Sequence, residues 1–193
     1  MTTKRRLLLA SIAYRQGTGD ALDGLLNAIA SRLQQSEHAI AGAIKHSVLR
    51  PERCRCDMIL ENLHTGEFIP ISQDRGAEAR GCVLDASALE GVVGSTLSGL
   101  EDGARFLVVN RFGKQEVDGR GFRPAIEFAA CHRVPCLVGV EQDNLSMWRA
   151  FAGDLHEELP SNLERVWDWC LGALSQGDPQ SQRVGHGERK LFA

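Results

Sequence analysis

A basic loop follows an apolar run near the middle of the chain, in the segment LVVNRFGKQEVDGRGF. Asn110 and Arg111 stand where the apolar run ends, and Lys114 and Glu116 follow shortly after. Arginine and lysine bind phosphate and other oxyanions, and a carboxylate can hold magnesium or activate water. The pattern predicts an anion site in which Asn110, Arg111 and Gly113 bind the ligand, and a solvated loop between strand and helix is the alternative. Lys114 and Glu116 are its candidate catalytic residues.

A glycine turn near the N-terminus is the second candidate, because it joins an apolar run to a helical pattern. Such a turn lets backbone N–H groups face a phosphate, and a helix N-terminus favours negative charge. A Walker-type loop also needs a lysine and a hydroxyl residue, but Asp20 and Ala21 occupy these positions. A plain strand-to-helix turn and a retained anion pocket both remain open. In the second case the ligand-binding residues are Gln16, Gly17, Thr18, Gly19 and Asp20.

Three further positions complete the candidate ligand site. Lys45 and His46 follow a second short apolar run, and Gln73 precedes a polar loop at residues 74–81. The histidines show no metal-binding spacing such as H-E-x-x-H, so we assign no metal ligands.

The cysteines leave two interpretations open. Cys54, Cys56 and Cys82 could together hold a soft metal, but their spacing differs from paired C-x-x-C motifs, and buried free thiols are the alternative. We expect Cys131, Cys136 and Cys170 to lie in the core.

The elements that position these residues alternate between apolar runs and amphipathic helical patterns. We predict strands at residues 7–14, 39–45, 105–109 and 135–140, a hairpin at 56–72, and helices at 20–34, 85–100, 123–132, 144–152 and 162–174. The alternation predicts an α/β fold with a mainly parallel sheet, helices on both faces and an antiparallel hairpin addition. Ligands in such folds bind beyond the carboxyl ends of the strands, which places the candidate residues at one edge.

Length and composition favour one domain over residues 1–175, followed by a flexible polar tail at 176–193. The formal net charge of −3 gives no sign of general nucleic-acid binding. The basic and apolar start of the chain is broken at Tyr14 and has no cleavage pattern, and no run is long enough to span a membrane. We therefore expect a cytoplasmic protein with reduced thiols.

Four segments carry a resemblance to a known family: AYRQGTGDALDGLL, CDMILENLHTGEFIPISQD, GCVLDASALE and VVNRFGKQEVDGRGFRPAIEFA. Together they span residues 13–140 and resemble the bacterial family known as domain of unknown function 2478. That family is similar to small P-loop nucleoside-triphosphatases, which carry D-E-I-G-x-M-E at the corresponding strand end. Asn110 and Arg111 replace the two acidic residues of that motif, while Gly113 and Glu116 remain. The resemblance implies a P-loop-NTPase-like three-layer sandwich with degenerate Walker motifs, and it links the chain to molybdenum metabolism.

These observations lead to three functional hypotheses. The first is an anion-binding protein, for a nucleotide or an oxyanion such as molybdate, without efficient hydrolysis; its cofactor would be Mg²⁺ with a nucleotide, or molybdate. The second is a residual nucleoside-triphosphate phosphohydrolase that uses Lys114 or Lys45 with Glu116 or Asp20. The third is a non-catalytic regulatory or assembly partner in molybdenum metabolism, acting through a protein partner or a homo-oligomer.

Overall fold

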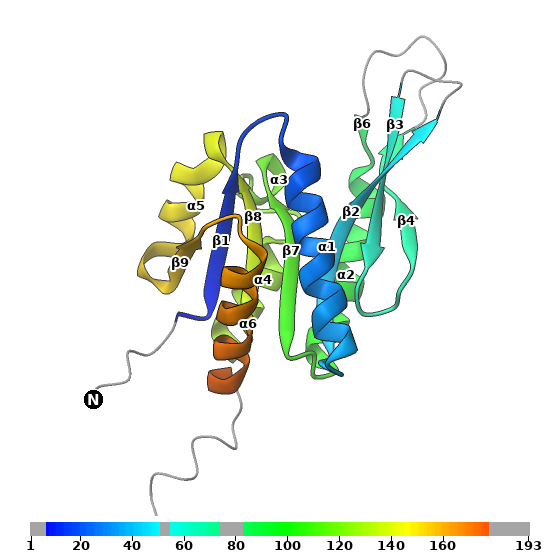
Figure 1. Ribbon diagram of the computed structural model, residues 1–193. Helices are drawn as coiled ribbons and strands as arrows, with labels where there is room; N and C mark the ends of the chain where they lie inside the picture. The colour runs from blue at the N-terminus through cyan, green and yellow to red at the C-terminus, as the bar shows by residue number, and fades with distance from the viewer. Residues whose placement is uncertain (1–6, 51–54, 74–82, 178–193) are drawn as a thin grey trace, which may run out of the picture.

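The computed structural model describes residues 7–50, 55–73 and 83–177, apart from the side chains of residues 47–50, 55–57, 73, 83 and 177 (Figure 1). A seven-stranded sheet forms its centre, in the order β4-β3-β2-β7-β8-β1-β9. Its strands are β1 (Leu9–Tyr14), β2 (Ile40–Arg50), β3 (Arg55–Asn62), β4 (Phe68–Pro70), β7 (Phe106–Phe112), β8 (Cys136–Glu141) and β9 (His156–Leu159). β1, β2, β7, β8 and β9 run parallel, whereas β3 and β4 are antiparallel additions beside β2.

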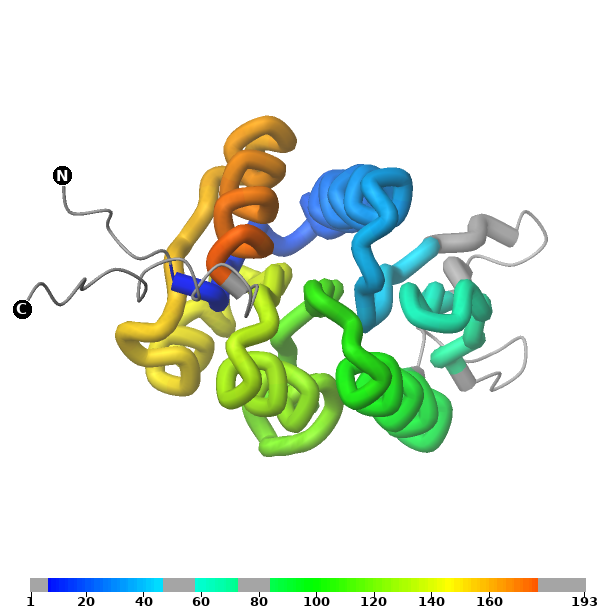
Figure 2. The backbone as a smooth tube through the Cα atoms, turned by 90° about the horizontal axis from the view of Figure 1, so that it is seen from below, coloured from blue at the N-terminus to red at the C-terminus, as the bar shows by residue number. Residues whose placement is uncertain are grey.

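Helices cover both faces of this sheet, so the fold has three layers (Figure 2). α1 (Gly19–Gln35) and α6 (Leu163–Gly177) lie on one face; α2 (Ala86–Glu101), α4 (Arg123–His132) and α5 (Leu145–Ala152) lie on the other. Short segments complete the described chain: α3 (Lys114–Val117), the 3₁₀ turns at Gln142–Asn144 and Gly153–Leu155, and the strand pair β5 (Ser72–Gln73) and β6 (Val83–Leu84). The predicted α/β class, parallel sheet and hairpin addition are confirmed.

Alternating side chains divide the core into two apolar clusters, one on each side of the sheet. On β7, Phe106 and Val108 face the α1 and α6 side, whereas Leu107 and Val109 face the α2 and α4 side. All four side chains are fully buried, as expected for a central parallel strand. The predicted apolar stripe of α1, with Leu22, Leu26, Ile29 and Leu33, is buried against the first of these faces.

Gly42 of β2 fixes how closely β2 approaches β7. Its φ is +116°, and a Cβ built there would collide with the carbonyl group of Val108. Only glycine combines this backbone conformation with the absence of a side chain. This close approach holds the carboxyl ends of the two strands beside each other.

The sequence patterns missed some features and misplaced one residue. β2 extends to Arg50 and pairs with β3, and neither β9 nor α3 was expected. Cys136 and Cys170 are buried as predicted, but the core placement of Cys131 is wrong, since it is exposed on α4 near the end of that helix. Residues 178–193 of the predicted tail lie outside the described residues. No described helix is both long and apolar enough to cross a bilayer.

Candidate functional site

The carboxyl ends of β1 and β7 and the middle of β2 meet the first turns of α1 at one end of the molecule, and β2 continues past them to Arg50 (Figure 1). The chain reaches this end from Tyr14 through a tight turn into α1. Gly17 has a φ of +82°, which favours glycine. The hydroxyl of Thr18 donates to the carbonyl of Arg15 at 2.8 Å and accepts from its N–H group at 3.2 Å. Thr18 therefore closes the turn.

Asp23, one turn into α1, is the centre of the charged groups at this end. Its side chain is only 10% exposed and accepts hydrogen bonds from three residues. Lys45 Nζ lies 3.4 Å from Oδ2, and Asn110 Nδ2 lies 3.1 Å from Oδ1. Arg111 Nη2 lies 3.3 Å from Oδ1 and 3.2 Å from Oδ2. One carboxylate thus gathers an amide and two cations from β2 and β7.

Asn110 holds the two strands together where their ladder ends. The last backbone register pair between β2 and β7 is Ala43 with Val109. Just beyond it, the N–H group of Lys45 donates to Asn110 Oδ1 at 3.1 Å. Since Asn110 Nδ2 donates to Asp23, both ends of this buried amide are engaged in the fold. The amide therefore stabilises the corner between two strands and a helix.

Arg111 lies between the first turn of α1 and the end of β1. Its guanidinium carbon is 5.3 Å from the centre of the Tyr14 ring, a cation–π contact. A Cβ at Gly19 would lie 2.5 Å from Nη2, so the glycine allows the guanidinium to pack on the helix start. Its Nε is buried and has no hydrogen-bond partner within the described residues. Arg111 thus keeps an unused donor at the N-terminus of α1.

Burial raises the pKa of the Tyr14 hydroxyl above its ordinary value. Arg111 lowers this pKa, whereas the nearby carboxylates of Glu141 and Asp23 raise it further. Tyr14 is the register partner of Glu141 at the ends of β1 and β8. The phenol therefore stays protonated at neutral pH and can serve as a hydrogen-bond donor beside the two cations.

Glu116 is committed to the loop that follows β7. It is 5% exposed, and its two carboxylate oxygens accept from the N–H groups of Gly113 at 2.8 Å and Phe122 at 3.0 Å. Burial raises its pKa, and these backbone hydrogen bonds lower it. A Cβ at Gly121 would collide with Oε1, so the loop is closed tightly around this carboxylate. Glu116 therefore fixes the path of the chain from β7 to α4.

The structure brings together only part of the predicted site. Lys45, Asn110 and Arg111 meet around Asp23, with Gly19 in contact with Arg111. Gln16, Gly17 and Thr18 form the exposed turn before them, and Asp20 is exposed in the first turn of α1. Lys114 is exposed at the start of α3, after its N-cap Gly113.

His46 belongs to a separate pair of side chains. Its Nε2 lies 2.7 Å from Glu61 Oε2 across β2 and β3. The side chain of Gln73, and the proposed thiol cluster of Cys54, Cys56 and Cys82, lie outside the described residues. Within the described ranges, no three His, Cys, Asp or Glu side chains are grouped so that they could hold a metal ion.

Sequence reasoning missed Asp23. The sequence feature that could have revealed it is its position on the helix. Asp23 lies directly after Leu22 and three residues before Leu26, and both leucines belong to the apolar stripe of α1. A charged residue at the border of a buried helix face is costly unless it is paired. The partners come from residues 45, 110 and 111, so only the fold shows the pairing.

Comparison with known proteins gives a family for this chain. Residues 9–169 match the family model described as protein of unknown function DUF2478, and the chain belongs to that family. It is 30% identical over 168 residues to the molybdenum import ATP-binding protein ModC 2 of Bradyrhizobium diazoefficiens, which covers 87% of this chain. The chain spans only 18% of the length of that relative. The structure also resembles THEP1 from the hyperthermophile Aquifex aeolicus, with a TM-score of 0.55 and 13% identity over 81% of this chain and 91% of THEP1. The predicted P-loop-NTPase-like three-layer fold is therefore confirmed.

Proposed function

We propose that this DUF2478 protein binds a small anion, either a nucleotide or an oxyanion such as molybdate, without efficient hydrolysis. The observation that carries the proposal is the shared carboxylate: Lys45 and Arg111 both pair with Asp23 beside the glycine turn of α1. The group of Lys45, Arg111 and Asp23 carries one net positive charge beside the helix N-terminus, where the exposed carboxylate of Asp20 also lies. The dipole of the helix adds to the attraction for an anion.

The side chains at this end suit binding through a few strong donors. Arg111 is 36% exposed, so part of its guanidinium is accessible to a ligand oxygen. Tyr14 adds a protonated hydroxyl, and Lys45 remains 17% exposed. Charged donors make shorter and stronger hydrogen bonds to oxyanions than neutral donors do.

The same geometry argues against efficient hydrolysis. Asp20 and Ala21 stand where a Walker loop has lysine and a hydroxyl residue. The amide of Asn110 is engaged by Lys45 and Asp23, and an amide cannot act as a base. Glu116, the remaining acidic candidate, is buried and bound to two backbone N–H groups. Of the candidates for holding magnesium or activating water, Asn110 and Glu116 are thus engaged in the fold, and Asp20 is exposed where a Walker loop has its lysine.

The relatives support the choice of ligands. ModC 2 is named as an ATP-binding protein of molybdenum import, which supports both a nucleotide and molybdate as candidates for this chain. We retain a cytoplasmic location as part of the proposal, since the proposed ligands and the free thiols suit that compartment.

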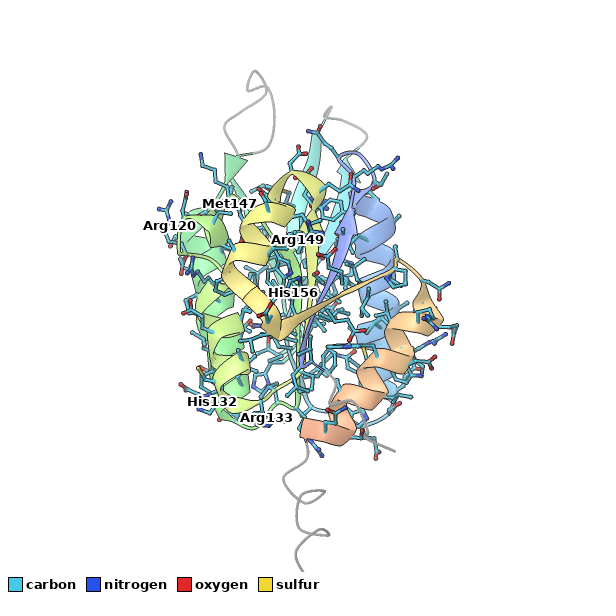
Figure 3. The ribbon with its side chains drawn as sticks, turned by 90° about the vertical axis from the view of Figure 1, so that its left-hand side faces the viewer. Arg120, His132, Arg133, Met147, Arg149 and His156 are labelled. Atoms are coloured by element: carbon cyan, nitrogen blue, oxygen red, sulfur yellow. The ribbon has the colours of Figure 1, made fainter. Side chains whose placement is uncertain are left out.

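Thermal unfolding with a ligand panel tests the proposal directly. The panel contains ATP, GTP, phosphate, molybdate and tungstate, each with and without Mg²⁺. A ligand at a hundred times its dissociation constant adds about 2.7 kcal/mol to the free energy of unfolding. We expect at least one anion to stabilise the wild type, and Arg111→Ala to abolish the shift. Arg149→Ala is the matched control, because Arg149 on α5 (labelled in Figure 3) pairs with Glu158 on β9 and not with Asp23. The absence of any shift across the panel would refute the proposal.

Residual hydrolysis is the alternative and needs a separate readout. It would use Lys114 or Lys45 in place of the loop lysine and Glu116 or Asp20 to handle magnesium or water. Mg²⁺-dependent phosphate release that disappears in both Lys114→Ala and Glu116→Gln would establish it. We expect release at the buffer rate, because the carboxylate of Glu116 is buried and fully engaged.

A further inference from the structure

The α1 face of the sheet continues past α1 without a covering helix in the described part of the chain. In Figure 1, α1 lies in front of the sheet, and β3 and β4 extend to its right with α2 behind them. Figure 2 shows the same arrangement from below. β4 is an edge strand of this sheet.

Strand pairing identifies the residues on this open face. Ile44 belongs to the cluster under α1, and it pairs with Glu61, which pairs with Phe68. Directly paired residues point to the same face, and alternate residues along a strand do so too. His46 therefore shares the face of Ile44, Glu61 and Phe68. We call His46, Glu61 and Phe68 the open-face cluster.

This cluster combines an exposed aromatic ring with a polar edge. Phe68 is 58% exposed, the second most exposed of the large apolar side chains in the described residues. His46 contacts its ring edge-on, with ring centres 5.2 Å apart, and binds Glu61 at 2.7 Å. The histidine and glutamate are 30% and 20% exposed. The arrangement holds the Phe68 ring in place and sets a carboxylate and an imidazole beside it.

The open-face cluster and the anion site share strand β2. Lys45 of β2 reaches Asp23 on α1, and His46 follows it and contacts Phe68. Neighbouring strands lie about 4.8 Å apart, so β4 is three spacings, about 14 Å, from β7, the strand of Arg111. A ligand that contacts both parts must therefore be extended, with an anionic group at Arg111 and a flat ring at Phe68.

We infer that the open-face cluster binds the base of a nucleotide whose phosphates occupy the site at Arg111 and Lys45. This inference rests on the proposed function and selects the nucleotide over a bare oxyanion. Bases stack on aromatic rings through their flat faces, and the N–H groups on a base edge find acceptors in Glu61. A bare oxyanion has no group that could use the Phe68 ring.

Phe68→Ala tests the contribution of the base to binding separately from that of the phosphates. Titration calorimetry would compare wild type and variant with three probes: ATP, GTP and inorganic tripolyphosphate, which lacks a base. We expect Phe68→Ala to weaken the better-bound nucleotide about ten-fold or more, the range of one base–aromatic stack. Tripolyphosphate should bind both proteins equally. Phe68→Tyr keeps the ring and should retain nucleotide affinity, and Leu155→Ala controls for removing another exposed apolar side chain.

The outcomes distinguish this inference from the proposed function. If ATP, GTP and tripolyphosphate bind wild type equally and Phe68→Ala changes none of them, the base site is refuted while anion binding stands. If no probe binds and phosphate and molybdate give no thermal shift either, both are refuted. Loss of tripolyphosphate binding in Phe68→Ala would also refute the base site, because it would show a general structural effect.

Discussion

Nη2 of Arg111 lies within 3.3 Å of both carboxylate oxygens of Asp23, so an internal carboxylate occupies the position where an external anion would pair with this cation. Lys45 binds the same carboxylate. Asp23 therefore stabilises the fold and competes with any ligand for the two cations. Binding and stability should change in opposite directions when its charge is removed.

Asp23→Asn tests this competition. The variant should bind inorganic phosphate or molybdate more tightly, because Lys45 and Arg111 lose their internal partner. Its free energy of unfolding should fall by about 1–3 kcal/mol, the usual effect of breaking charged hydrogen bonds at a partly buried site. Calorimetric titration and urea unfolding measure the two effects. Asp118→Asn, which alters an exposed ion pair with Arg120, should change neither. Weaker anion binding by Asp23→Asn would contradict the competition.

Asn110→Asp introduces an acidic residue at this strand end, as the resemblance to P-loop nucleoside-triphosphatases suggests. The new carboxylate would stand where Nδ2 now donates to Asp23 at 3.1 Å, so two carboxylates would face each other. We expect the free energy of unfolding to fall by about 1–3 kcal/mol at pH 7 and by less near pH 4, where one carboxyl can hold a proton and donate. Phosphate release should stay at the buffer rate.

Urea unfolding of Asn110→Asp at the two pH values measures this effect. Asn110→Ala removes the amide without adding charge and should show no such pH dependence. Equal stability of Asn110→Asp and wild type at pH 7 would show that the amide donor is not required.

Glu116 makes the free energy of unfolding depend on pH, and the sign of this dependence follows from its raised pKa. Burial raises its pKa, so just above the ordinary carboxyl range the folded state still holds a proton that the unfolded chain has released. This contribution to stability is complete below the unfolded pKa and is lost as the pH rises through the folded pKa. The free energy of unfolding of wild type relative to Glu116→Gln should therefore decrease as the pH rises from about 4 towards 7.

Urea unfolding at a series of pH values measures this difference. Glu116→Gln should itself be less stable by about 1–3 kcal/mol, since a Gln side chain has one acceptor oxygen for two backbone N–H groups. Glu127→Gln, in an exposed ion pair on α4, is the matched control and should show no comparable trend. A difference that increases with pH would mean that the backbone hydrogen bonds outweigh burial.

Gly42→Ala should be strongly destabilising. The new Cβ would meet the carbonyl of Val108, and the φ of +116° is unfavourable for any other residue. Overpacking and backbone strain together should cost about 2 kcal/mol or more. Gly94→Ala in α2 is the control, because a Cβ there meets no atom within 4 Å, and alanine should raise helix stability by up to about 1 kcal/mol. Similar unfolding midpoints for both variants would refute the role of the close strand approach.

Local sequence patterns were sufficient to predict the helices and strands whose apolar residues recur with a strong period. The stripe from Leu22 to Leu33 predicted α1, and the apolar run ending at Val109 predicted β7, because burial of one helix face or of a whole strand leaves a regular pattern. The helix predicted at residues 123–132 likewise has the observed bounds of α4, Arg123–His132. By contrast, β9 was missed because its four residues HEEL lie at an exposed sheet edge and carry no apolar period.

The sequence by itself determined that cationic and polar residues follow the strands at one edge of a parallel sheet. Asn110 and Arg111 were found in this way, because chain order places them at the end of β7. Lys45 was also found, although β2 continues past it to Arg50. Tertiary structure alone decided their partners. Asp23 joins them from another element, Glu116 turns inward to two backbone N–H groups, and His46 pairs with Glu61 instead. Hydrogen bonds and ion pairs depend on distances of a few ångströms between residues far apart in the chain, and no local pattern encodes those distances.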